Sequence, residues 1–176
     1  LIHQPFSDYY GSYRAMEEAY RDGRVRAIGV SNFYPDRYLD LAHFAAVAPA
    51  VNQVETHLFQ QQKTAKQYLK KYGTQLMSWG PFAEGRNDYF NTPALLEIGR
   101  KYGKTSAQVA LRFLLQSGVV VIPKSVHVQR MKENFDVFDF ALTPDEMERL
   151  EALDGGKSLF FSHYDPETVA WFMSLV

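Results

Sequence analysis

The chain has 176 residues, of which 46% are hydrophobic and 15% aromatic, so we expect one folded domain with a sizeable core and exclude a disordered chain. Nineteen Lys and Arg residues offset 20 Asp and Glu residues, and the resulting net charge of -1 argues against a nucleic-acid partner. The lack of cysteine excludes disulfides, thiolate metal sites and a cysteine nucleophile, and every apolar run is far shorter than the ~20 residues of a membrane span. We therefore expect a cytoplasmic protein without a membrane partner.

The first half of the chain is predicted to alternate helices and strands. Apolar residues at helical spacing predict a helix over residues 11–23, with Ser12 as its N-cap. β-Branched residues predict a strand over residues 25–30, and Pro35 is typical of the first turn of the next helix. A strand over residues 49–55, a helix over residues 62–72 and a strand over residues 75–79 follow.

The second half continues the alternation. Gly103 separates two predicted helices, and an unbroken apolar run over residues 119–122 predicts a buried strand. Thr143, followed by Pro144 and then by Glu146 three residues after the cap, is typical of a helix start. The predicted helices here cover residues 93–102, 106–116, 128–135, 143 to about 153, and a short stretch after Pro166.

This pattern is typical of a parallel α/β fold, either a doubly wound sheet or a barrel. Counting the opening Leu1 and Ile2 as the end of a strand gives five strands. Ligands of such folds bind at the carboxyl ends of the strands, so the residues that follow each strand are the candidates for a site. These residues are His3, Ser31, Asn32, Gln53, Trp79, Gly80, Lys124 and Ser125.

Three familiar motifs are incomplete. Residues 99–105 resemble a phosphate loop, but three residues instead of four separate the glycines and the segment interrupts helices, so we interpret it as a helix break. Residues 29–33 begin like a nucleophile elbow, but Phe33 replaces its second glycine, which makes a hydrolase a weak hypothesis. The histidines show no metal-ligand spacing, so we expect no metal.

Lys124 and Ser125 lie between a predicted strand and a predicted helix that carries Arg130. Free N–H groups and the positive end of a helix favour an anion there, and Arg and Lys could hold a phosphate through charge-assisted hydrogen bonds. A solvated basic helix face explains the same residues equally well.

Taken together, the motifs resemble the aldo-keto reductase family of NADPH-dependent (β/α)₈ TIM barrels, most closely its bacterial aldehyde and 2,5-diketogluconate reductases. They occur in family order over nearly the whole chain, which is far more specific than any single motif. The resemblance implies that residues 1–176 are the C-terminal portion of one barrel domain, with strands 4 to 8 and the C-terminal helices. The motifs are LIHQP from Leu1, GRVRAIGVSNF from Gly23, NQVE from Asn52, WGP from Trp79, IPKS from Ile122 on to Arg130 and Asn134, and LTPDEM from Leu142.

The resemblance also implies roles for single residues. His3 would be the catalytic histidine that donates to the substrate carbonyl, and Trp79 would stack on the nicotinamide ring. Each has an ordinary structural alternative, a satisfied strand-end histidine and a rim aromatic. For the nicotinamide carboxamide, the implied contacts are Ser31, Asn32 and Gln53. The loop over the pyrophosphate would contain Gly80 and Phe82, with the Glu84 side chain turned away. The 2′-phosphate would be held by Lys124, Ser125, Val126 and Arg130, and adenine would contact Glu133 and Asn134.

The implied function is NADPH-dependent reduction of a small aldehyde or ketone to an alcohol by hydride transfer. The aspartate, proton-donating tyrosine and lysine that complete the family's catalytic tetrad are not matched here, and none of the 11 tyrosines fits the donor. Because a positioned general acid is typically worth ~10²–10⁴-fold in rate, we expect a truncated form of a longer protein that is monomeric at full length.

Two alternatives remain open. The same barrel could bind NADPH without catalysis, as a regulatory or scaffold protein, and upstream sequence with the tetrad tyrosine and lysine would favour the enzyme instead. A half-barrel that works only as an oligomer is the other. In the tail, Leu159, Phe160, Phe161 and Trp171 either shape an apolar substrate pocket or simply pack on the barrel.

Overall fold

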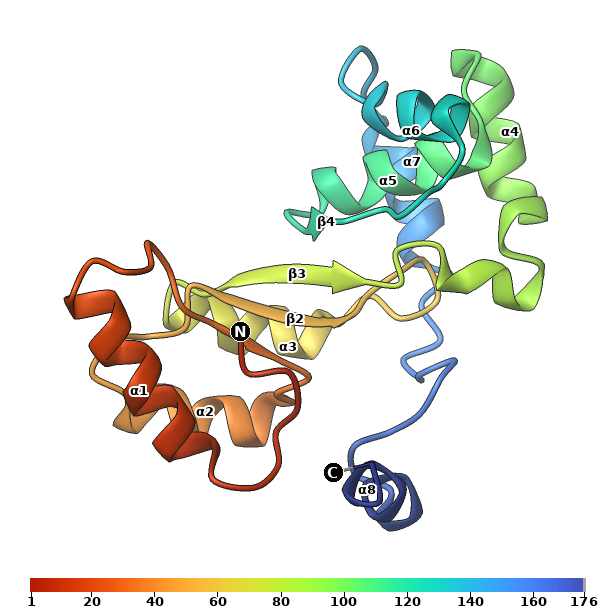
Figure 1. The fold of residues 1–176 in the computed structure, drawn as a ribbon. Helices are drawn as coiled ribbons and strands as arrows, with labels where there is room; N and C mark the ends of the chain where they lie inside the picture. Colours follow the sequence, from red (N-terminus) through yellow and green to blue (C-terminus); the bar gives the residue numbers. More distant parts are fainter. Residues whose placement is uncertain (176) are drawn as a thin grey trace. The chain divides into compact units, whose positions relative to one another are not determined.

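The computed structural model describes residues 1–175, which form two units that each combine helices with strands (Figure 1). Unit 1 comprises residues 1–54, residues 63–75 and the tail from Ser158, so three separate stretches of sequence build it. Unit 2 comprises residues 55–62 and 76–157. Helices alternating with parallel strands agree with the predicted α/β class.

The elements of unit 1 are α1 (Tyr9–Arg21), β1 (Val30–Ser31), α2 (Pro35–Phe44), β2 (Val51–Glu55, of which Glu55 counts with unit 2), α3 (Lys63–Lys71) and α8 (Pro166–Met173). Strands β1 and β2 are parallel, with Val30 opposite Asn52 and Ser31 opposite Gln53. Ile2 forms a single bridge to Val30, in which the Ser31 N–H donates to the Ile2 carbonyl oxygen at 2.7 Å. This pairing places the residues after Ile2 and after β1 at the same edge.

Three predictions for unit 1 were wrong in detail. The predicted strand over residues 25–30 is reduced to β1, and the predicted opening strand is reduced to the Ile2 bridge. Gly29, just before β1, is needed for close approach, since a Cβ there would lie 2.6 Å from the Val51 carbonyl oxygen. The N-cap of α1 is Asp8 and not Ser12, because the Asp8 carboxylate accepts from the Gly11 N–H at 2.8 Å.

The elements of unit 2 are β3 (Gln75–Trp79, of which Gln75 counts with unit 1), η1 (Ala83–Asn91), α4 (Pro93–Tyr102), α5 (Ser106–Gln116), β4 (Val120–Val121), α6 (Val128–Phe135) and α7 (Pro144–Glu151). Strands β3 and β4 are parallel, with Met77 opposite Val120. Figure 1 shows α4, α5, α6 and α7 in one group, with β4 beside α5. The predicted bounds of β3, α4, α5 and α6 are confirmed. Gly103, in the left-handed conformation with φ 65°, ends α4 as the break between helices predicted.

The strand predicted as buried over residues 119–122 is only partly so. Val119 is 3% exposed, whereas Val120 is 39% and Ile122 is 55% exposed. An apolar run indicates which residues favour burial. It does not indicate whether other described residues pack on both faces of the strand. The 3₁₀ segment η1 was not predicted, because its left-handed residues, among them Glu84, Asn87 and Asp88, give no helical periodicity.

Each unit has its own apolar core. In unit 1 the fully buried side chains include Tyr13, Phe33, Tyr38 and Leu41. In unit 2 they include Tyr89, Leu95, Leu111 and Phe113. Within residues 1–175, no helix combines the length and apolar character needed to cross a membrane.

Candidate functional site

In unit 1 the loop after Ile2 is fixed through its backbone. The Asn32 Nδ2 donates to the His3 carbonyl oxygen at 3.0 Å, and the Arg37 guanidinium donates to the Pro5 carbonyl oxygen. The His3 side chain is exposed and has no hydrogen bond or ion pair within residues 1–175. The structure therefore holds the His3 backbone while leaving its imidazole accessible to a ligand.

Ser31, Asn32 and Gln53 lie together at the end of the β1–β2 pair. The Ser31 hydroxyl donates to the Gln53 carbonyl oxygen at 2.8 Å, and the Asn32 Nδ2 lies 3.2 Å from the Ser31 Oγ. Asn32 adopts the left-handed conformation with φ 61°, which Asn tolerates better than most residues and which turns its amide back toward His3. One hydroxyl and two amides supply the donors and acceptors that a carboxamide requires.

Asn52, next to Gln53, is a buried polar residue whose role the sequence did not reveal. Its side chain is fully buried, and its Nδ2 donates to the Phe33 carbonyl oxygen at 2.7 Å. The Asn52 Oδ1 has no hydrogen-bond partner within the described residues. The only signal in the sequence is a polar residue on the buried face of an alternating strand, while Gln53 on the other face stays half-buried.

In unit 2 the segment after β3 forms a tight turn. Gly80 has φ 63°, and the Ala83 N–H donates to its carbonyl oxygen at 2.8 Å. The buried Tyr89 hydroxyl donates to the Pro81 carbonyl oxygen at 3.0 Å, and burial raises the pKa of Tyr89. The turn is thus anchored from inside, which holds Phe82 5.6 Å from the Phe90 ring centroid.

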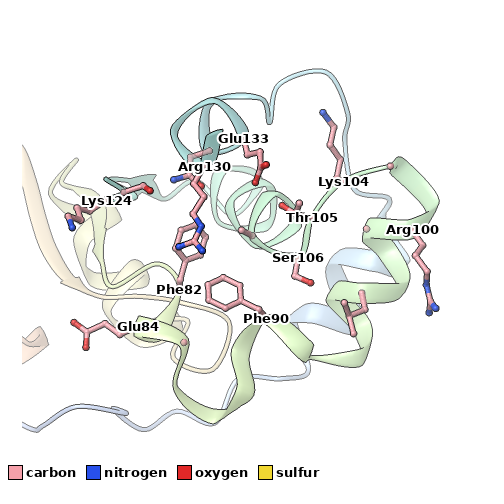
Figure 2. Close-up of a pocket in the computed structure, with 17 residues that line it drawn as sticks. Phe82, Glu84, Phe90, Arg100, Lys104, Thr105, Ser106, Lys124, Arg130 and Glu133 are labelled. Atoms are coloured by element: carbon pink, nitrogen blue, oxygen red, sulfur yellow. The ribbon is translucent and has the colours of Figure 1, made fainter. Parts of the chain in front are cut away.

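This turn borders a cavity of about 830 Å³ in unit 2 (Figure 2). Of the predicted cofactor contacts in this unit, the structure brings six together around it, while Trp79, Gly80 and Val126 lie outside its lining. Trp79 is half-buried and Val126 is 69% exposed. The predicted residues in the lining are Phe82, Lys124, Ser125, Arg130, Glu133 and Asn134.

The charges around the cavity are unevenly paired. Arg130 and Lys124 have no hydrogen bond or ion pair within residues 1–175, and Figure 2 shows the Arg130 side chain directed from α6 toward Phe82. Lys104 is instead held 2.8 Å from both Asp136 and Asp139. Glu84 is turned away from Arg130 in Figure 2 and lies 3.9 Å from the Arg86 guanidinium. Lys124 and Arg130 are therefore available to an anion.

The opposite wall of the cavity was missed by sequence reasoning. It is formed by the end of α4 and the start of α5, where the helix break at Gly103 was predicted but not its place beside a cavity. The capping box of Thr105 with Gln108 was a signal for the start of α5, and it fixes this wall. The missed lining residues include Phe90, Leu96, Gly99, Arg100, Thr105, Ser106 and Ala107.

No cluster of histidine and carboxylate side chains within the described residues could hold a metal ion. His57, fully buried, is 2.9 Å from the Glu55 carboxylate through its Nε2, and its Nδ1 accepts from the Phe59 N–H at 3.2 Å. Both ring nitrogens are therefore engaged with protein groups of unit 2.

Comparison with known proteins gives a consistent result. Glyoxal reductase of Bacillus subtilis (strain 168) is 44% identical over 155 residues, which cover 88% of this chain and 55% of that protein. The crystal structure of the aldo-keto reductase MGS-M4 from a Medee basin deep-sea metagenome library is 38% identical with a TM-score of 0.86, covering 92% of this chain and 61% of that one. A Gox0644 variant solved in complex with NADPH is 37% identical with a TM-score of 0.78, covering 83% of this chain and 54% of that one.

The chain thus spans about half the length of the curated relatives it matches. Residues 1–155 match the family described as "Aldo/keto reductase family". Since this match covers most of the sequence, the chain belongs to the aldo/keto reductase family.

Proposed function

We propose that the whole protein, of which this chain is the C-terminal portion of a single barrel domain, reduces an aldehyde or ketone to an alcohol with NADPH in the cytoplasm. The observation that carries this proposal is the cavity of unit 2, where Arg130 and Lys124 line a ligand-sized space and form no ion pair within residues 1–175. NADPH, when bound, supplies the hydride. The substrate is a small carbonyl compound, and the full-length protein is a monomer.

The donor set around the cavity fits the phosphate end of this cofactor. The Arg130 guanidinium and the Lys124 ammonium would hold the 2′-phosphate, because charge-assisted hydrogen bonds to phosphate are stronger than neutral ones. Glu133 and Asn134 on the same helix would accept from and donate to adenine. Phe82 and Leu96 supply apolar surface in the same lining. NADH lacks the 2′-phosphate, so this arrangement favours NADPH.

The residues of unit 1 fit the nicotinamide end. Ser31, Asn32 and Gln53 would orient the carboxamide, and Trp79 in unit 2 would stack on the ring. The exposed His3 imidazole would donate to the substrate carbonyl and polarise it. The relatives are longer than this chain, and we place the tyrosine that donates the proton, with its aspartate and lysine partners, in the part of the protein that corresponds to their unmatched residues.

The test is a fluorescence titration of the chain with NADPH and with NADH, comparing the wild type with Arg130→Ala. Because Arg130 is exposed, we expect a loss of about tenfold in NADPH affinity and no change in NADH affinity. Arg24→Ala, which removes an exposed arginine paired with Asp22 in unit 1, is the matched control. Equal losses for both nucleotides would overturn the 2′-phosphate assignment.

A second measurement addresses the reaction. The whole protein, supplied with glyoxal and NADPH, is expected to consume NADPH, which is followed by its absorbance. Binding of NADPH without consumption of the nucleotide across a panel of aldehydes and ketones would favour the non-catalytic regulatory or scaffold alternative.

A further inference from the structure

His163, in the tail before α8, is packed in an aromatic cluster of unit 1. His163 is only 6% exposed, and its ring stacks on that of Phe172 with centroids 5.5 Å apart and an interplanar angle of 11°. Phe6, from the loop after His3, lies 5.6 Å away, and Phe161 lies 5.3 Å away. The cluster joins the tail to the loop that carries His3.

The hydrogen bonds of His163 define its tautomer. Its Nε2 lies 2.6 Å from the Gln4 Oε1, and a carbonyl oxygen can only accept, so the proton is on Nε2. Nδ1 is then an acceptor, and the Tyr34 hydroxyl lies 3.4 Å from it. Burial and the nearby Arg37 charge lower the pKa of His163 to about 4, so the ring is neutral near pH 7.

Gln4 connects this ring to the candidate nicotinamide site. The Asn32 Nδ2 lies 3.5 Å from the same Gln4 Oε1 and donates to the His3 carbonyl oxygen at 3.0 Å. The Gln4 oxygen is therefore shared between the tail and the amide of Asn32. If that oxygen moved, the Asn32 amide would lose one of the groups that orient it.

We propose that His163 is a positioning residue, which holds the Gln4 amide so that Asn32 and the His3 backbone keep the orientation needed at the nicotinamide end of the cofactor. The inference rests on the proposed function, in which Asn32 contacts the carboxamide. His163 acts through Gln4 and donates nothing to the ligand itself. The tail thereby contributes to cofactor geometry through one hydrogen bond.

The first variant is His163→Phe, which keeps an aromatic ring against Phe172 and removes both nitrogens. Two probes report on the two ends of the cofactor: nicotinamide mononucleotide and adenosine 2′,5′-bisphosphate. We expect the affinity of the chain for the mononucleotide to fall by about two- to tenfold and the affinity for the bisphosphate to stay unchanged. Tyr34→Phe, which removes the hydroxyl beside Nδ1 and the His163 backbone N–H but leaves the contact between His163 and Gln4, is the control and should change neither affinity.

A spectroscopic readout separates this inference from the proposed function. In NMR spectra without nucleotide, His163→Phe should shift the side-chain amide resonances of Gln4 and Asn32, whereas Tyr34→Phe should leave them in place. Failure of the wild type to bind the mononucleotide would overturn the proposed role of unit 1, and the amide shifts would still decide whether His163 orients Asn32.

If His163→Phe does not fold, Gln4→Met serves instead, since it removes the shared oxygen and leaves His163 in place. It should shift the Asn32 amide resonance and weaken mononucleotide binding by the same factor. Unchanged Asn32 resonances, or an unchanged mononucleotide affinity in a folded variant of a chain whose wild type binds it, would overturn the inference.

Discussion

The two units prepare for a ligand in opposite ways. In unit 1 the Ser31 and Asn32 side chains already donate hydrogen bonds to the carbonyl oxygens of Gln53 and His3. In unit 2 the candidate cations Lys124 and Arg130 line a cavity and have no partner within residues 1–175. On the proposed function, unit 1 would orient the cofactor, because fixed neutral groups preorganise a site. Unit 2 would attract it, because unpaired cations bind an anion.

The largest expected effect comes from removing the two unpaired cations of unit 2. The double variant Lys124→Ala/Arg130→Ala should weaken NADPH binding by about a hundredfold at low salt, since two charge-assisted contacts are lost. Raising the salt concentration should weaken the wild type and hardly affect the double variant, because salt screens exposed charges. Titrations at two salt concentrations measure both effects, with Arg24→Ala/Arg26→Ala as the control pair from unit 1.

The next effect concerns the stability of unit 2 alone. Glu146, 6% exposed, accepts hydrogen bonds from Lys101 at 2.7 Å, from Tyr102 at 2.9 Å and from the Thr143 N–H at 2.8 Å. Glu146→Ala removes all three and the capping box of α7, which should lower the free energy of unfolding by about 2 kcal/mol. Urea denaturation measures this change, and Glu97→Ala, at an exposed ion pair with Arg149, should leave the midpoint unchanged.

The two units should also lose stability over different pH ranges. Burial opposes ionisation of Glu146, but its hydrogen bonds outweigh burial and lower its pKa to about 2, below the ordinary 4.5. The carboxylate therefore stabilises unit 2 above pH 4.5, and this contribution disappears as the pH falls toward 2. For His163 the folded pKa of about 4 is below the ordinary 6.5, so the unfolded chain binds the proton first and unit 1 weakens as the pH falls from 6.5 to 4.

Two tryptophans allow these pH ranges to be measured separately, because Trp79 belongs to unit 2 and Trp171 to unit 1. Fluorescence of the single-tryptophan variants Trp79→Phe and Trp171→Phe should show unit 1 changing at the higher pH. Around His163 the other charged and titratable groups are Arg37, Tyr34 and the Tyr164–Asp36 pair, whose hydroxyl and carboxylate are 2.9 Å apart. Coincident transitions in both variants would contradict the separation.

The smallest effect sharpens the description of unit 1. Asp8→Ala should lower the free energy of unfolding by about 1 kcal/mol, because the N-cap of α1 is lost. Ser12→Ala should have no effect, since Ser12 is inside the helix. Thermal denaturation of both variants distinguishes the two residues. A larger loss of stability for Ser12→Ala than for Asp8→Ala would support Ser12 as the N-cap, as the sequence pattern predicted.

Helix bounds in unit 2 were predictable from the sequence because local chemistry fixes them. Gly103 supplies the left-handed residue that ends α4, and Thr105 and Thr143 form complete capping boxes at the starts of α5 and α7. Apart from β3, strands were predicted too long, because strand extent depends on pairing with distant residues. Residues 25–29 have β-branched character but lie outside β1, where Val25 is 40% exposed.

For the candidate site, polar and charged residues after the predicted strands were identified from the sequence. The structure brings several of them together within each unit. Lys124 and Arg130 were expected near one anion, and they line one cavity. The sequence could not show that they form no ion pair within residues 1–175, because it does not reveal that Asp136 and Asp139 pair with Lys104 instead. The role proposed for His163 had no local signal in the sequence, since its partner Gln4 is 159 positions away.

That separation has a consequence for synthesis. Residues 76–157 of unit 2 have all left the ribosome before His163 does, whereas unit 1 needs the tail to complete its aromatic cluster. At roughly 5–20 residues per second, the loop of Gln4 and Phe6 stays without its cover for about 8 to 30 seconds. In that interval the Phe6 ring lacks its partners His163 and Phe172, so the aromatic cluster of unit 1 forms only after the tail has been synthesised.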